Sequence, residues 1–190
     1  MRVMPEFALQ PHPSTPCTWI ESLTVRADWL SPDLLVLYYR IQGDIDRLQL
    51  PPQRRSAHAD ALWKSTCLEA FLRPAGGAAY IECNFSPSSE WALYTFDGYR
   101  ANMRALEAAR APKLLFRRRT GELDADVDLP LSELHLAAAT ELEIGLCAVL
   151  QEVDGGLCYW ALAHPDAKPD FHHAQSFAAT LKPPKEVDRG

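Results

Sequence analysis

The 190-residue sequence lacks the features that mark several large classes of protein. It contains no run of about 18 apolar residues, the length that a membrane-spanning helix needs. Its N-terminus, MRVMPEFALQPHPSTP, has no apolar core of the kind found in secretory signal peptides. We therefore expect no membrane partner and a location in the cytoplasm.

Motifs for nucleotide chemistry and the charge expected for nucleic-acid binding are also missing. No GxGxxG or phosphate-binding loop is present, and no serine or cysteine lies within a known nucleophile motif. The net charge of −6 disfavours a general nucleic-acid surface. We expect no nucleic-acid partner.

The five cysteines lack the spacing of a metal or disulfide framework. They are Cys17, Cys67, Cys83, Cys147 and Cys158. Their number is odd and no CxxC pair occurs, which argues against a zinc ribbon or a complete set of disulfides. We expect small buried thiols.

Helical periodicity is scarce, and the chain consists mainly of short strand-like runs between turn signals. The expected strands cover residues 19–28, 34–41, 45–50, 63–72, 79–86, 91–96, 113–119, 122–128, 141–152, 157–162 and 175–181. A short helical spacing occurs only after Tyr99, at 103–110, where Pro112 would end it. The pattern predicts an all-β fold, an antiparallel β-sandwich of the jelly-roll type with little helix. We expect one domain over residues 1–190, with an extended lead-in at 1–17 and a frayed tail at 183–190.

The run Arg117-Arg118-Arg119 belongs to the clearest hairpin in the chain, KLLFRRR-TG-ELDADVD. If Thr120-Gly121 is a two-residue loop, Arg119 faces Glu122 and Arg117 faces Asp124. Opposite charges then meet across one face of the hairpin. This interpretation explains the arginines without any ligand.

The stretch from Leu62 to Tyr99 predicts three consecutive strands with an unusual face. A period of two places Glu69 beside Trp63, Cys67 and Phe71, and a second carboxylate, Glu82, between Tyr80 and Asn84. Polar groups among large apolar ones are costly unless they are paired. The pattern therefore indicates a concave ligand-binding face, and favours a binding module over an enzyme.

Several motifs together resemble the bacterial DOMON-like domains. They are the run 63–71, NFSPSSEW at 84–91, FDGYR at 96–100, YWALAHP at 159–165 and KPDFHH at 168–173. The resemblance covers nearly the whole chain. The superfamily also contains haem- and sugar-binding DOMON domains and family-nine carbohydrate-binding modules, so the resemblance implies a ligand-binding β-sandwich.

The resemblance to family-nine modules also implies site residues. Those modules use a Trp and, six positions later, a Glu on the same strand, which here match Trp63 and Glu69. A second Trp on a late strand would hold the sugar ring between two indoles, and Trp160 matches it by order along the chain. The Asp that often precedes the Glu in these modules is replaced by Thr66 and Cys67.

The chemistry of sugar binding suits these side chains. An indole can cover the apolar C–H face of a pyranose, so Trp63 and Trp160 would stack on it. Glu69, Glu82 and Asn84 would bond the hydroxyls. Arg26 or Arg40 could supply the counter-charge. The alternative is that the tryptophans belong to the core and that Glu69 has a structural arginine partner.

A late loop contains a second group of candidate residues. His164, Asp170 and His172 lie within ten positions, and such residues can bind zinc or another divalent cation. Adjacent histidines in extended chain point to opposite sides, so His172 and His173 would not line the same site. A loop pinned by hydrogen bonds through Asp170 and a histidine is the alternative.

Three other functions remain open at this point. Glu69 and Glu82 could form the acid and base of a metal- or carboxylate-dependent enzyme acting on a glycoside-like ligand. Met103 and His164 could be the axial ligands of a DOMON-type haem, although the sequence has no CxxCH. A protein-interaction scaffold would show a large exposed apolar patch instead of a pocket.

Overall fold

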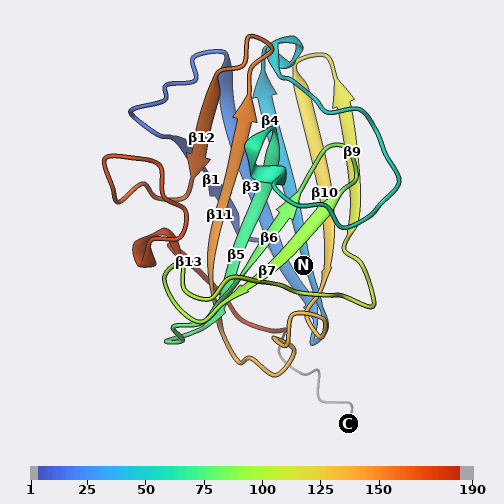
Figure 1. Cartoon of the computed structure of the whole chain (residues 1–190), viewed down its shortest axis with the longest axis vertical. Coiled ribbons are helices and arrows are strands. Elements are labelled where there is room, and N and C mark those ends of the chain that lie inside the picture. The colour runs from blue at the N-terminus through green and yellow to red at the C-terminus, as the bar shows by residue number, and fades with distance from the viewer. Residues whose placement is uncertain (1–3, 185–190) are drawn as a thin grey trace.

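The computed structural model describes residues 4–184, and these are nearly all β-structure (Figure 1). The strands are β1 (Glu6–Ala8), β2 (Gln10–Pro11), β3 (Ile20–Ser31), β4 (Leu34–Gly43), β5 (Cys67–Pro74), β6 (Tyr80–Phe85), β7 (Trp91–Phe96), β8 (Arg104–Ala105), β9 (Lys113–Arg119), β10 (Glu122–Pro130), β11 (Leu142–Gln151), β12 (Leu157–Ala161) and β13 (Ala179–Leu181). Within the described part of the chain, helix is limited to three 3-10 turns, η1 (Ile45–Arg47), η2 (Leu62–Lys64) and η3 (Ala174–Ser176). The all-β prediction is confirmed.

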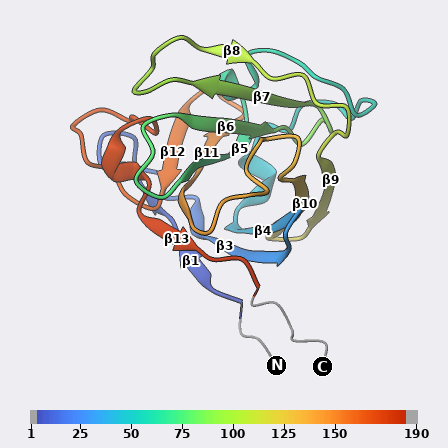
Figure 2. The same ribbon diagram turned by 90° about the horizontal axis from the view of Figure 1, so that it is seen from below.

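The strands form two antiparallel sheets that face each other (Figure 2). The small sheet has the order β1-β3-β4-β10-β9. The large sheet has the order β2-β12-β11-β5-β6-β7-β8, with β13 paired to one end of β11. The arrangement is the expected β-sandwich. No helix within residues 4–184 is long and apolar enough to cross a membrane.

The main core lies between the two sheets, where alternate residues of every long strand turn inward. Leu68, Ala70 and Leu72 of β5 are buried there against side chains of the small sheet such as Leu37. The hydroxyl of the fully buried Tyr39 donates a hydrogen bond of 2.8 Å to the backbone carbonyl of Glu69. The small sheet therefore supports β5 at the residue whose side chain leaves on the opposite face.

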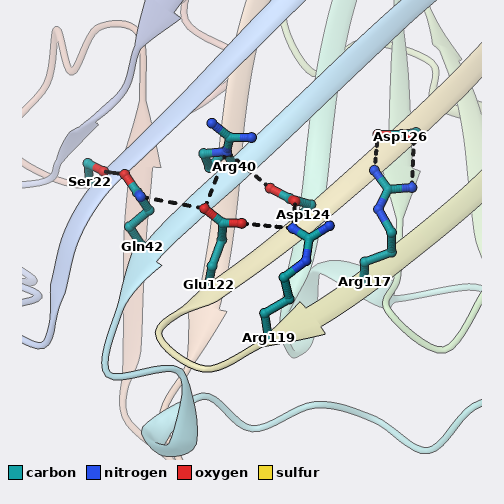
Figure 3. A network of polar contacts seen from close by, with 8 residues as sticks. All are labelled: Ser22, Arg40, Gln42, Arg117, Arg119, Glu122, Asp124 and Asp126. Atoms are coloured by element: carbon teal, nitrogen blue, oxygen red, sulfur yellow. Dashed lines mark hydrogen bonds and ion pairs between the residues drawn. The ribbon is translucent and has the colours of Figure 1, made fainter.

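The Arg-rich hairpin has the predicted register, with Arg119 opposite Glu122 and Arg117 opposite Asp124. The ion pairs are partly diagonal, because Arg117 pairs with Asp126 at 2.8 Å while Arg119 pairs with both Glu122 and Asp124 (Figure 3). Acidic neighbours therefore surround the arginines on the exposed face of the small sheet, as expected of a solvated charge run.

Local backbone conformation overturns one expectation and shifts two others. No helix forms at 103–110, because Arg100 and Asn102 adopt positive φ and Leu106 N bonds to Leu93 O, so this segment pairs with β7. The expected strand at 45–50 is instead the turn η1, followed by a single bridge at Leu48. The last strand starts at Ala179, since η3 occupies its expected beginning.

Both termini can be compared with expectation only in part. The lead-in forms the edge strands β1 and β2 and buries Leu9. Most of the expected frayed tail, residues 185–190, and residues 1–3 lie outside the described residues.

Candidate functional site

A pocket of about 340 Å³ opens on the outer face of the large sheet, the face that points away from the small sheet. Aromatic and ionisable side chains alternate around it. It is lined by Trp63, Glu69, Phe71, Glu82, Phe96, Arg100, Met103, Val149, Tyr159, Pro169, Phe171 and His172. The volume falls within the range of about 300–1,000 Å³ typical of small-molecule sites. We call it the outer-face pocket.

Strands β5 and β6 bring the two predicted carboxylates to this pocket. Phe71 lies opposite Glu82 and Glu69 lies opposite Asn84 in the antiparallel register. Residues that alternate along a strand share a face, so both carboxyls point outward as diagonal neighbours. Glu69, Glu82 and Asn84, the polar residues predicted to bind the ligand, therefore lie on one face of the large sheet.

Glu69 is buried without a hydrogen-bond partner for one of its oxygens. Its exposed fraction is 2 %, and among the described residues no group bonds Oε1. Its other oxygen, Oε2, has only a weak contact of 4.0 Å with the Sγ of Cys147. Burial, and then the charge of Glu82, raise the pKa of Glu69 well above its ordinary value. An acid in this state either keeps its proton or requires a polar ligand.

Glu82 is also buried, but it has protein partners. Its Oε1 accepts a hydrogen bond of 2.8 Å from Asn84 Nδ2, and its Oε2 lies 3.6 Å from His172 Nε2. Burial raises the pKa of Glu82, while the bond from Asn84 and the charge of Arg100 act in the opposite direction. Asn84 does not line the pocket itself and instead orients the Glu82 carboxyl.

His172 projects from the loop between β12 and η3 and covers one side of the pocket. Its Nδ1 shares a hydrogen bond of 2.7 Å with the Tyr80 hydroxyl, and its ring meets the rings of Phe71 and Phe96 edge-on. Burial, and then the charge of Arg100, lower the pKa of His172 to about 4. The imidazole is therefore neutral at neutral pH.

Arg100 and Asp170 form a charged rim, which sequence reasoning did not find in full. The Arg100 guanidinium bonds Asp170 Oδ1 at 2.8 Å, and the Tyr99 hydroxyl bonds Asp170 Oδ2 at 2.6 Å. Arg100 lies in the FDGYR turn with φ of 51°. The two partners are 70 residues apart, so only the fold brings them together. Asp170 was predicted at the rim, whereas Arg100 was missed.

The two predicted tryptophans lie on opposite faces of the large sheet. Trp63 belongs to η2, ahead of β5, and lines the pocket with its ring edge-on to Tyr94. Trp160 is 4 % exposed and packs in the core between the sheets. On β12 it is Tyr159 that points outward and lines the pocket. The expected clamp between two indoles is therefore not formed.

The early arginines do not reach the pocket either. Arg40 lies on the outer face of the small sheet, 3.2 Å from Asp124 (Figure 3). Arg26 lies over the ring of Tyr38. The sandwich core separates them from Glu69. The cation that lines the pocket is Arg100, in the turn after β7, and not Arg26 or Arg40 as expected.

The candidate metal ligands are engaged in other contacts. His164 bonds the backbone carbonyl of Gln10 at 2.8 Å and meets the ring of His12, while Asp170 is held by Arg100. Within residues 4–184, no three His, Cys, Asp or Glu side chains are placed to hold a metal ion. Met103 lines the pocket and His164 does not, so the expected haem ligands also lie apart. These residues fit neither a metal nor a haem.

Gly145 of β11 allows the loop that carries His172 to approach the sheet. A Cβ at this position would lie 2.9 Å from the backbone oxygen of Ser176, whose hydroxyl bonds the carbonyl of Asp170. We expect Gly145→Ala to displace this loop and to lower the free energy of unfolding by about 1–3 kcal/mol, the usual range for overpacking. Hydrogen exchange of residues 170–177 should increase.

Gly98→Ala is the matched control for Gly145→Ala, because a Cβ at Gly98 would meet nothing within 4 Å. Unchanged exchange in residues 170–177 of Gly145→Ala would show that the close approach has no structural role. Increased exchange in Gly98→Ala as well would also show that the close approach of Gly145 to Ser176 is not the cause.

No known protein-family model and no curated protein sequence matches the chain. Among solved structures it is similar to a Bacteroides uniformis protein provisionally described as carbohydrate-binding, at 13% identity over 94% of this chain and 86% of that chain, with a TM-score of 0.68. It is also similar to a family-nine carbohydrate-binding module from Caldicellulosiruptor kristjanssonii. The complex of that module with cellotriose matches at 10% identity over 97% of this chain and 85% of that chain, with a TM-score of 0.61. Its complex with glucose matches at 12% identity over 92% of this chain and 82% of that chain, with a TM-score of 0.54.

These similarities show that the chain has the fold of family-nine carbohydrate-binding modules, as the resemblance implied. The relation to DOMON domains stays a prediction. At 10–13% identity the similarity concerns the fold alone.

Proposed function

We propose that this protein binds a carbohydrate in the outer-face pocket. The observation that carries the proposal is Glu69, a residue that lines the pocket and whose buried Oε1 has no hydrogen-bond partner among residues 4–184. Leaving such a group unpaired costs about 1–3 kcal/mol. A ligand hydroxyl would remove that cost. Two structures with the same fold contain glucose and cellotriose, which supports a ligand of this class.

The walls of the pocket suit the two faces of a pyranose ring. Trp63, Tyr159 and Phe171 offer aromatic surface to its C–H groups. Glu69 and Glu82 can accept hydrogen bonds from its hydroxyls. In this proposal Trp63 and Glu69 keep the roles that the sequence predicted, and Tyr159 takes the place expected for Trp160.

Calorimetric titration with a panel of mono- and disaccharides tests the proposal. We expect saturable binding of at least one sugar and a higher melting temperature with that sugar present. Trp63→Ala should remove about 1.4 kcal/mol or more of stacking energy. That loss corresponds to binding about tenfold weaker or more. Arg40→Gln, on the opposite sheet, should bind like the wild type. No heat and no change in melting temperature across the panel would contradict the proposal.

Hydrolysis of a glycoside is a second candidate, favoured by one observation. Glu69 and Glu82 open into the same pocket, and burial raises the pKa of both. Glycosidases use two carboxyl groups, one of them with a raised pKa as the acid. Release of nitrophenol from aryl glycosides, abolished by Glu82→Gln, would support hydrolysis. Binding without any turnover would leave the protein a binding module.

A further inference from the structure

The inner wall of the outer-face pocket contains more acidic than basic side chains. Glu69 and Glu82 form its floor, with exposed fractions of 2 % and 5 %. Of the described residues that line it, Arg100 is the only permanent cation, and Asp170 holds Arg100 at the rim. His172, with its lowered pKa, adds no charge at neutral pH. The floor therefore has two acids and no cation of its own.

Aromatic rings surround these two acids. Phe71 and Phe96 border the carboxyls, and Trp63, Tyr159 and Phe171 complete the apolar walls. The negative faces of aromatic rings attract cations, and the attraction is larger where water is excluded. Aromatic walls and acids that can ionise both favour a positively charged ligand over a carboxylate.

The remaining requirement is a donor for the unpaired Oε1 of Glu69. A sugar hydroxyl supplies one neutral donor. A protonated amine supplies three donors and a charge, and charge-assisted hydrogen bonds are about twice as strong as neutral ones. One ammonium group could therefore serve both carboxyls, which lie on adjacent strands as diagonal neighbours.

We infer that the pocket selects an amino sugar, or a similar polyhydroxylated amine, and that its ammonium group binds between Glu69 and Glu82. The inference rests on the proposed function, because it names the chemical class of ligand for the same pocket. The hydroxyls and the C–H face of such a ligand would contact the aromatic walls and the rim, as for any sugar.

Amine binding should release protons. Burial raises the pKa of both acids and so favours their protonated forms, whereas an ammonium group stabilises the ionised forms and displaces protons to solvent. The titratable and charged groups around them come from every neighbouring element. They are Tyr39 beneath β5, Cys67 on β5, Tyr80 and Cys83 on β6, Tyr94 on β7, Cys147 on β11, Tyr159 on β12, and Arg100, Asp170 and His172 on the loops.

The test is calorimetric titration of the whole chain with matched pairs of ligands. Glucosamine, galactosamine and mannosamine are compared with glucose, galactose and mannose, with N-acetylglucosamine and with glucuronate. We expect one amino sugar to bind at least tenfold more tightly than its neutral parent, and glucuronate not to bind. Repeating the titration in buffers with different ionisation enthalpies should show net proton release. Affinity should rise with pH as the acids ionise, and fall once the amine loses its own proton.

Glu69→Gln keeps the shape of the side chain and removes its charge, so it should reduce the preference for the amine to less than about twofold. Glu82→Gln provides a second variant if Glu69→Gln does not fold, and the amide oxygen that it introduces can still accept the hydrogen bond from Asn84. Glu21→Gln, an exposed position on β3, is the matched control and should keep the wild-type preference.

The outcomes separate the two proposals. A neutral sugar that binds as tightly as its amine would overturn the inference and leave carbohydrate binding intact. An amine preference that survives in Glu69→Gln and Glu82→Gln would overturn the placement of the ammonium group. No binding of any sugar, neutral or charged, would overturn both.

Discussion

Wild-type protein should lose about 3 kcal/mol more stability than His172→Gln when the pH falls from 7 to 4. Burial and the charge of Arg100 lower the pKa of His172 from 6.5 to about 4 in the folded protein. A lowered histidine pKa contributes stability that is present above the unfolded value of 6.5 and is lost as pH falls from there towards 4. Each pKa unit corresponds to about 1.4 kcal/mol, which gives the expected size.

Urea unfolding at a series of pH values would measure this difference. Glu69 and Glu82 act in the opposite direction, because their raised pKa values contribute stability that is lost as pH rises. These acids are present in both proteins, so the comparison isolates His172. His135→Asn removes an exposed histidine and should follow the wild type. Parallel curves for wild type and His172→Gln would contradict a buried neutral imidazole, as would a titration of the ring near 6.5 by NMR.

Gly43→Ala should lower the free energy of unfolding by roughly 3 kcal/mol or more. Gly43 ends β4 opposite Ile20, next to a bulge in β3, and has φ of 146°. A Cβ there would lie 2.5 Å from the backbone oxygen of Trp19. Backbone strain and a clash with main chain each cost about 1–3 kcal/mol. For a protein of this size that loss lowers the melting temperature by roughly 6–12 °C.

Gly76→Ala provides the control for Gly43→Ala. Gly76 also has positive φ, at 74°, but a Cβ there would meet nothing within 4 Å. It should cost only the backbone strain, about 1–2 kcal/mol. Calorimetric melting of the two variants separates strain from clash. Equal losses would show that the contact between Gly43 and Trp19 is unimportant.

The sequence was sufficient to predict the sandwich, the hairpin register and the residues that share a face within β5 and within β6. Alternation and the two-residue turn decide these features, but the face shared by Glu69 and Glu82 depends on the register between β5 and β6. The same rule could not place Trp160. Both faces of β12 are rich in apolar residues, so nothing in its pattern shows whether Tyr159 or Trp160 points into the core.

The remaining differences come from backbone conformation and from distant contacts. Trp63 continues the alternation of β5 in sequence, yet it lies in the turn η2 after Ala61, which has φ of 61°. Arg100 reaches the pocket because Asp170, 70 residues away, binds it. The helical spacing at 103–110 does not produce a helix, because Arg104 and Ala105 pair with β7. The last two outcomes depend on partners that are not adjacent in sequence.

A crystal structure of the protein soaked with the tightest-binding sugar of the panel tests the central claim most directly. We expect the ligand in the outer-face pocket, with a polar atom within hydrogen-bond distance of Glu69 Oε1 and its ring against the aromatic wall that includes Trp63. A ligand bound only at another surface, with Glu69 Oε1 still unpaired, would contradict the account.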